Sequence, residues 1–141
     1  MSVEENKATL LRYVNEVFNK GDVSRLEAFM HESYVVHTGL DMEIKGFQGV
    51  KDFVAMMRGA FPDLHVTIEH LVAEGDEVAY RARLTGTHQG ELFGQPPTGR
   101  VISIFENTFI RYKDGKALEA WALADRVGML KQLGAFPEGV R

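Results

Sequence analysis

The sequence predicts one α+β domain, in which helices near the start of the chain pack on one face of an antiparallel sheet. Apolar residues recur at helical spacing over much of residues 2–61, and from Leu64 onward they alternate with polar residues as they do in strands. The chain has 141 residues without an internal repeat or linker, which indicates a single core. We therefore expect residues 1–141 to form one domain, with a curved sheet that wraps around the helices as a cone and encloses a cavity.

Two helices are expected at the start of the chain. The first begins at Ser2, which can form a capping box with Glu5, and it ends at Gly21. Asp22 is the expected cap of a second, shorter helix over residues 23–30, because four apolar side chains there share a helical face.

A short strand and a third helix follow. Residues 34–38 have the composition of a strand, and Gly46 and Gly49 lead into the helix. Pro62 ends this helix, because proline disfavours helical geometry in the residue before it, Phe61.

The second half of the chain predicts two hairpins and a terminal helix. Gly75-Asp76 and residues 113–116 have the composition of tight turns between paired strands. Asp125 can cap the terminal helix over residues 127–133 by accepting hydrogen bonds from its first amides. The four expected strands span residues 65–73, 78–87, 101–112 and 117–124.

The composition excludes several classes of protein. The net charge is -4, whereas binding of nucleic acid through charge alone needs a basic surface. The absence of cysteine excludes disulfides, thiolate metal sites and thiol nucleophiles. The segment that follows Met1 is acidic, and the chain contains no apolar run of membrane-spanning length. We expect a cytoplasmic protein that binds neither nucleic acid nor membrane.

Metal and cofactor motifs are also missing from the sequence. His31 and His37 lack the spacing of a zinc-binding pair on a helix, and no loop resembles a calcium site. The glycines Gly39, Gly46 and Gly49 do not form a phosphate-binding loop, and there is no nucleophile elbow. The sequence therefore predicts no metal and no cofactor.

Four phrases of the sequence carry a resemblance to a known family. They are AFPDLH, AEGDEVAYRARLTGTHQGELFGQPPTG, RYKDGK and EAWALADRVGMLKQLG, in this order. From about Ser2 to Gly134 the chain resembles the SnoaL-like polyketide cyclase (ester cyclase) family of the nuclear-transport-factor-like, or cystatin-like, superfamily. The resemblance implies a curved antiparallel sheet around a cavity, often a dimer, and a cofactor-free intramolecular aldol condensation of a polyketide ester.

The chain departs from the family at the positions that carry its chemistry. In the cyclases an acid/base Asp lies six residues beyond the Lys of the D-G-K turn, and here that position is Ala122. A Gln and a His face the cavity from the preceding strand, and here Glu106 and Thr108 stand in their places. Two functions therefore remain open, namely acid/base chemistry on a small apolar carbonyl or ester compound, and binding of a small apolar ligand without turnover.

Glu106 is the main catalytic candidate because it lies in an apolar row. A carboxylate in such surroundings is costly to ionise, so its pKa should be raised, which suits a general base. The alternative is a solvated or salt-bridged Glu106 at a subunit contact, which pairs with Arg81 or Arg83 of a neighbouring strand. The other residues expected on its face of the strand are Ile102, Ile104, Thr108, Ile110 and Tyr112.

His37 and Tyr13 are candidates for assisting groups. His37 ends a strand near the expected cavity mouth, and Tyr13 lies on the apolar side of the first helix. Each also has the structural interpretation of a packed, hydrogen-bonded residue, and the superfamily's ketosteroid isomerases supply the analogy for a catalytic Tyr with a carboxylate. His88 is either a pocket residue or a residue that shapes its loop.

The remaining expectations concern the pocket wall and the outer sheet face. Small side chains around Ala122 leave room for a ligand, and Phe53, Met57 and Phe61 are expected in the apolar lining with Thr108. The opposite sheet face is too apolar to stay exposed, which predicts a homodimer that pairs this face. It carries Phe105, Phe109, Trp121 and Leu123.

Overall fold

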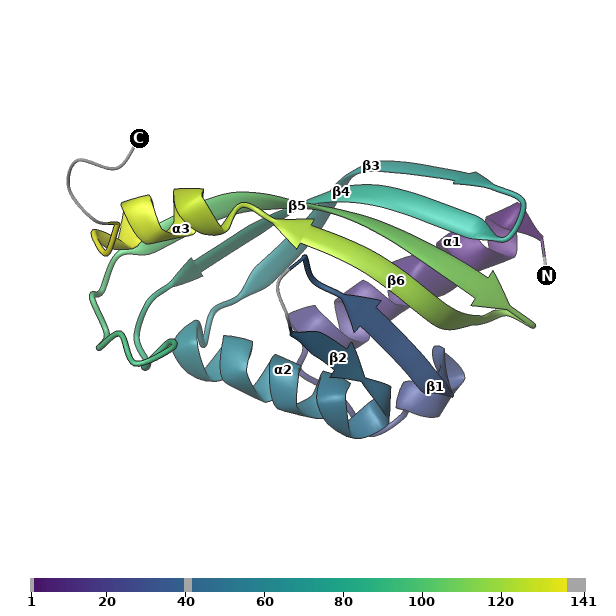
Figure 1. The fold of residues 1–141 in the computed structure, drawn as a ribbon, viewed down its shortest axis with the longest axis horizontal. Helices are drawn as coiled ribbons and strands as arrows, with labels where there is room; N and C mark the ends of the chain where they lie inside the picture. The colour runs from purple at the N-terminus through teal and green to yellow at the C-terminus, as the bar shows by residue number, and fades with distance from the viewer. Residues whose placement is uncertain (1, 40–41, 137–141) are drawn as a thin grey trace.

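The computed structural model, which describes residues 2–39 and 42–136, is an α+β domain whose six-stranded sheet arches over two helices (Figure 1). No helix in this part of the chain is both long and apolar enough to cross a membrane. The strands lie in the order β2-β1-β6-β5-β4-β3. The helical elements are α1 (Val3–Tyr13), η1 (Val14–Asn19), η2 (Leu26–Ala28), α2 (Gly46–Ala60) and α3 (Arg126–Leu133). The strands are β1 (Met30–His37), β2 (Glu43–Lys45), β3 (His65–Glu74), β4 (Glu77–Thr87), β5 (Val101–Lys113) and β6 (Lys116–Ala124).

The first helix begins as its capping box predicts. The Ser2 side chain accepts a hydrogen bond from the Glu5 amide, and the Glu5 carboxylate accepts one from the Ser2 amide. After Tyr13 the α-helix widens into the π-helical turn η1, a form that occurs as short insertions. The Asn19 side chain then bonds both the N–H and the C=O of Val66, which attaches the end of η1 to β3.

The expected second helix over residues 23–30 is wrong. Only the 3₁₀ turn η2 forms there, and Met30 already belongs to β1. The physical reason is a partner distant in sequence, because the amide of Ala117 in β6 donates to the carbonyl of Phe29 and Met30 pairs with Ala117. Leu26, Phe29 and Met30 are thus buried in the core without forming an α-helix.

The sheet is mixed, which corrects the expected antiparallel one. Strand β1 runs parallel to β6, with Val36 opposite Ala120, and the short edge strand β2 pairs antiparallel to β1. The other pairs are antiparallel, and both hairpins form where the sequence predicts them. The α+β class and the curved sheet over N-terminal helices are confirmed (Figure 1).

The ends of α2 and α3 follow the local signals. Helix α2 stops at Ala60, and Phe61 leaves helical geometry before Pro62. The Asp125 side chain accepts from the Gly128 amide at the start of α3, and Gly134 ends the helix with a φ of 74°. Helix α3 lies against β5, where the Gln132 side chain bonds the backbone of Ser103.

Candidate functional site

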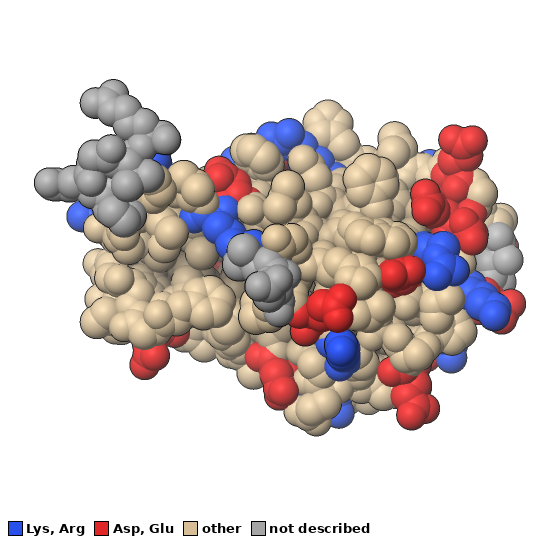
Figure 2. Space-filling view, in the orientation of Figure 1, with Lys and Arg blue, Asp and Glu red and all other residues tan. Residues whose placement is uncertain are grey.

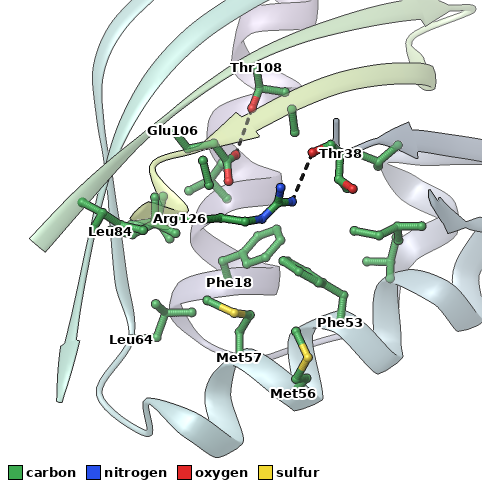
Figure 3. Close-up of a pocket in the computed structure, with 18 of the residues that line it drawn as sticks. Phe18, Thr38, Phe53, Met56, Met57, Leu64, Leu84, Glu106, Thr108 and Arg126 are labelled. Atoms are coloured by element: carbon green, nitrogen blue, oxygen red, sulfur yellow. Dashed lines mark hydrogen bonds between the residues drawn. The ribbon is translucent and has the colours of Figure 1, made fainter. Parts of the chain in front are cut away.

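A cavity of about 140 Å³ lies between the concave face of the sheet and the helices (Figure 3). Its wall is mostly apolar, because the inward positions of the strands and the facing sides of α1 and α2 carry aliphatic and aromatic residues. A few polar side chains interrupt this wall. They are Tyr13 of α1, Tyr34 of β1, Tyr80 of β4, Glu106 and Thr108 of β5, Thr38, and Arg126 of α3.

Glu106 points into this cavity because residues of β5 alternate between the two sheet faces. The Thr108 hydroxyl donates a hydrogen bond of 2.9 Å to Oε1 of Glu106 (Figure 3), and the Tyr80 hydroxyl lies 3.5 Å from the same atom. Both contacts hold one oxygen of the carboxylate.

The surroundings of Glu106 change its acidity. Burial raises the pKa of Glu106, because the charged form loses hydration in the apolar cavity. The hydrogen bonds from Thr108 and Tyr80 and the positive charge of Arg126 lower the pKa, and they offset only part of this increase. Glu106 is thus poised to accept and return a proton closer to neutral pH than an exposed carboxylate is.

The alternative pairing of Glu106 with an arginine of β4 is wrong. Arg81 and Arg83 lie on the other face of the sheet, since β4 places them beside Asn107 and Phe105. The Arg81 guanidinium lies 3.9 Å from the centroid of the Phe105 ring, and Arg83 pairs with Glu69.

Tyr13 and Tyr80 lie in the cavity wall with Glu106, and Tyr13 was expected there from the sequence. Tyr13 lies in the cavity wall as expected, where its ring packs edge-on against Phe18. Burial raises the pKa of Tyr13 and of Tyr80 well above the ordinary value, so both keep their protons and can donate hydrogen bonds. Tyr80 was not predicted to face the cavity. It lies two residues from Val78 and from Ala82, in the inward row of β4, just as Glu106 lies in the inward row of β5.

His37 is not brought to Glu106 or to the cavity wall. In β1 the inward positions are Tyr34 and Val36, so His37 faces outward. Its ring contacts the carboxylates of Glu43 and Glu119 and stacks on the ring of Trp121. The hydrogen bond with Glu119 is the largest of the causes that raise the pKa of His37.

The expected lining residues divide into two groups. Phe53, Met57, Thr108 and Ala122 line the cavity, with Ala122 opposite Thr108 on β6. Phe61 and His88 do not belong to the lining, since Phe61 is fully buried in the core with its ring centroid 5.6 Å from that of His88.

His88 holds the loop between β4 and β5. Its Nδ1 accepts a hydrogen bond from the Thr98 amide and lies 3.0 Å from the Thr98 hydroxyl. The backbone of His88 also pairs with Gly99 and Arg100. These contacts match the loop-shaping interpretation of His88.

Arg126 is a polar cavity residue that the sequence analysis missed. It is the first residue of α3, and its side chain extends back from the end of the sheet into the cavity (Figure 3). One Nη2 N–H donates to the Thr38 carbonyl at 3.1 Å. The sequence signal was weak, because the direction of a side chain at a strand-to-helix junction depends on how α3 packs against β5.

The structure shows no cluster of three or more His, Asp or Glu side chains able to hold a metal ion within residues 2–39 and 42–136. The polar groups of the cavity supply one carboxylate, hydroxyl groups and one guanidinium. These groups can bind an organic molecule and move a proton.

Comparison with known proteins identifies the family. The family model for SnoaL-like polyketide cyclases matches residues 8–133. The aklanonic acid methyl ester cyclase DnrD of Streptomyces peucetius is 30% identical over 138 residues, which cover 94% of this chain and 95% of DnrD. A SnoaL-like polyketide cyclase from Agrobacterium tumefaciens has a TM-score of 0.77 at 25% identity, covering 95% of this chain and all (100%) of that one. TsrD from Streptomyces laurentii has the same fold, with a TM-score of 0.86 at 24% identity and coverage of 96% and 99%. The chain therefore belongs to the SnoaL-like polyketide cyclase family.

Proposed function

We propose that this protein catalyses a cofactor-free proton transfer at the carbon next to the carbonyl group of a small apolar ketone or ester, in an aldol cyclisation or an isomerisation. The observation that carries the proposal is the carboxylate of Glu106, which Thr108 holds in a mostly apolar cavity and whose pKa is raised. The ester cyclases among its relatives support a substrate of this class.

The proposed step needs only groups of this chain. Oε2 of Glu106 takes a proton from the α-carbon, and the electron pair of the broken C–H bond moves toward the carbonyl oxygen to form an enolate. Thr108 and Tyr80 hold Oε1 during this transfer. The protonated hydroxyl of Tyr13 lies in the same wall and is suited to donate to the new oxyanion. In a cyclisation, the enolate carbon attacks a second carbonyl group, whose π electrons move to its oxygen, and protonated Glu106 returns the proton to this alkoxide. In an isomerisation, protonated Glu106 returns the proton to another carbon of the enolate.

Exchange of carbon-bound protons tests this activity without knowledge of the natural substrate. 2-Indanone in D₂O, followed by proton NMR, should lose its α-protons faster with the protein than in buffer alone. The rate should increase as pH rises through the pKa of Glu106, because only the ionised carboxylate can accept a proton. An exchange rate equal to the buffer rate, for 2-indanone shown to bind, would contradict the proposal.

One observation favours a second function, which is binding without turnover. Ala122 stands where the cyclases of this family have their acid/base Asp, and it faces the cavity. A protein that only binds would hold 2-indanone without accelerating exchange. The same assay therefore separates the two functions.

We also propose that the protein is a homodimer that pairs the convex faces of two sheets. Phe109 is 55% exposed and Leu123 is 64% exposed on this face. Trp121 of β6 lies next to Phe109 of the neighbouring strand β5. Uncharged side chains cover the middle of the molecule in Figure 2, where β5 and β6 cross the view, and charged side chains lie mainly around them. Burying this face against a second copy removes apolar surface from water.

Light scattering after size-exclusion chromatography should show twice the chain mass of 15.8 kDa at micromolar concentration. Phe109→Glu should give the monomer mass, because it places a charge in the paired face. Leu11→Glu, at an exposed position of α1 away from the sheet, should remain dimeric. A monomeric wild-type protein would contradict the dimer.

A further inference from the structure

Arg126 neither takes nor gives the proton that Glu106 is proposed to transfer, yet its guanidinium is directed into the cavity. Figure 3 shows it between Glu106 and the Thr38 carbonyl. The side chain is half-buried, and its positive charge acts on Glu106 against the pKa increase caused by burial, though less than the hydrogen bonds from Thr108 and Tyr80 do. Placing a cation in an apolar wall costs free energy, which calls for a functional explanation.

The position of Arg126 is set by a backbone group. Its Nη2 donates to the Thr38 carbonyl, and the buried Thr38 side chain in turn bonds the Met42 carbonyl. A guanidinium has five N–H donors in a planar fork, so this bond orients the group and leaves donors for a second acceptor. Such a fork matches two oxygens in one plane, as in a carboxylate or in the enolate of a 1,3-dicarbonyl compound.

The charge of the cavity also favours an anionic ligand. When Glu106 is protonated, as its raised pKa favours, Arg126 is the charged group of the cavity wall within the described residues. An anion of one negative charge would neutralise it in surroundings where an ion pair is screened less than in water. The volume of about 140 Å³ is close to that of an engineered cavity that holds benzene, about 150 Å³.

We propose that Arg126 is the specificity-determining residue of the cavity and binds a planar two-oxygen anion on a ligand with a body of about one ring. The proposal rests on the proposed function, since it places the oxyanion of the ligand opposite the Glu106 carboxyl. In the enolate-forming reaction, the charge that leaves Glu106 arrives on the oxygens that Arg126 contacts. A neutral molecule of the same shape has no such partner.

Calorimetry with three probes tests the proposal. Benzoate carries the carboxylate, benzamide is its neutral analogue, and 1,3-cyclohexanedione supplies the enolate. We expect wild-type protein to bind at least one of the two anions about ten- to a hundredfold more tightly than benzamide, as charge-assisted hydrogen bonds predict. Binding of benzoate alone assigns a carboxylate ligand, and binding of the dione alone assigns an enolate.

Three variants identify the residue responsible. Arg126→Gln should remove the preference for the anion, and Arg126→Lys should keep part of it, because lysine retains the charge without the fork. Arg81→Gln is the matched control, since Arg81 lies on the convex face against Phe105. Thermal unfolding of each variant shows that it is folded.

The pH dependence of binding supplies a readout that a structural arginine would not change. Anion affinity should weaken as pH rises through the pKa of Glu106, because the ionised carboxylate repels the ligand, and Glu106→Gln should remove this dependence. The hydrogen-bonding and charged groups that act on Glu106 are Thr108, Tyr80 and Arg126, and Tyr13 and Tyr34 lie in the same cavity wall. Burial raises the pKa of each of these tyrosines well above the ordinary value, so Glu106 is the group among them whose titration is expected to change the affinity.

Anion binding unchanged in folded Arg126→Gln would overturn the proposal, and so would failure of both anions to bind wild-type protein better than benzamide. The proposed catalytic function can fail separately. If Glu106→Gln leaves 2-indanone exchange unchanged while Arg126→Gln loses anion binding, the cavity binds anions without using Glu106 as a base. If exchange depends on Glu106 while Arg126→Gln binds both anions normally, only the role of Arg126 is refuted.

Discussion

Replacing Glu106 by Gln is expected to slow the protein-catalysed exchange of 2-indanone protons by about 10²–10⁴-fold, the contribution typical of a general base. Glutamine has nearly the same shape and keeps an oxygen that can accept the Thr108 hydrogen bond, but it cannot take a proton. The affinity for 2-indanone should therefore change little. Proton NMR gives the exchange rate, and calorimetry with the same ketone gives the affinity.

The stability of the Glu106→Gln variant separates catalysis from structure. Glu106 has its pKa raised in the folded state, so it contributes stability that is present below its unfolded pKa and is lost as pH rises through the folded pKa. In the variant, the free energy of unfolding should lose this dependence on pH between the unfolded and the folded pKa of Glu106. A large loss of stability together with loss of both binding and exchange would instead indicate a structural role.

Replacing Ala122 by Asp is expected to move the midpoint of the pH profile of 2-indanone exchange to higher pH. Ala122 pairs with Thr108 across the β5–β6 ladder, so a side chain there enters the cavity one diagonal step from Glu106. Two carboxylates at this separation disfavour each other's ionisation, and the pKa of at least one rises further. The new carboxylate also restores the group that the resemblance to the cyclases leads one to expect at this position.

Ala122→Asn is the matched control for this experiment, because asparagine has the same shape without the charge. It should leave the midpoint of the pH profile where it is in wild-type protein. Identical profiles for the Asp and Asn variants, with both proteins folded, would mean that position 122 does not act on Glu106. Turnover of a 1,3-dicarbonyl ester by the Asp variant alone would show that the restored acid supports aldol chemistry.

Much of the site followed from strand alternation. The row that contains Glu106 and Thr108 faces inward as their spacing in β5 predicts, and both line the cavity. The same rule applied to β4 places Tyr80 inward, and applied to β1 it turns His37 outward, because Tyr34 and Val36 take the inward positions. The orientations of Tyr80 and His37 could therefore have been predicted from the sequence.

Other features depend on contacts between distant segments. Residues 23–30 have helical periodicity, but the ladder between β1 and β6 overrides this local preference. Strand β2 spans three residues and has no periodicity of its own, so its pairing with β1 is what defines it. The inward direction of Arg126 depends on the packing of α3 on β5, which no local pattern encodes.

The pKa of Glu106 tests most directly whether this residue is a buried base. Carbon-13 NMR of protein labelled at the glutamate carboxyl carbons follows each titration, and the Glu106→Gln variant identifies the resonance of Glu106 by its absence. We predict a pKa above the ordinary range for glutamate, since burial in the cavity disfavours the charged form more than Thr108, Tyr80 and Arg126 favour it. A Glu106 carboxyl that titrates within or below that range would contradict the account of Glu106 as a buried base.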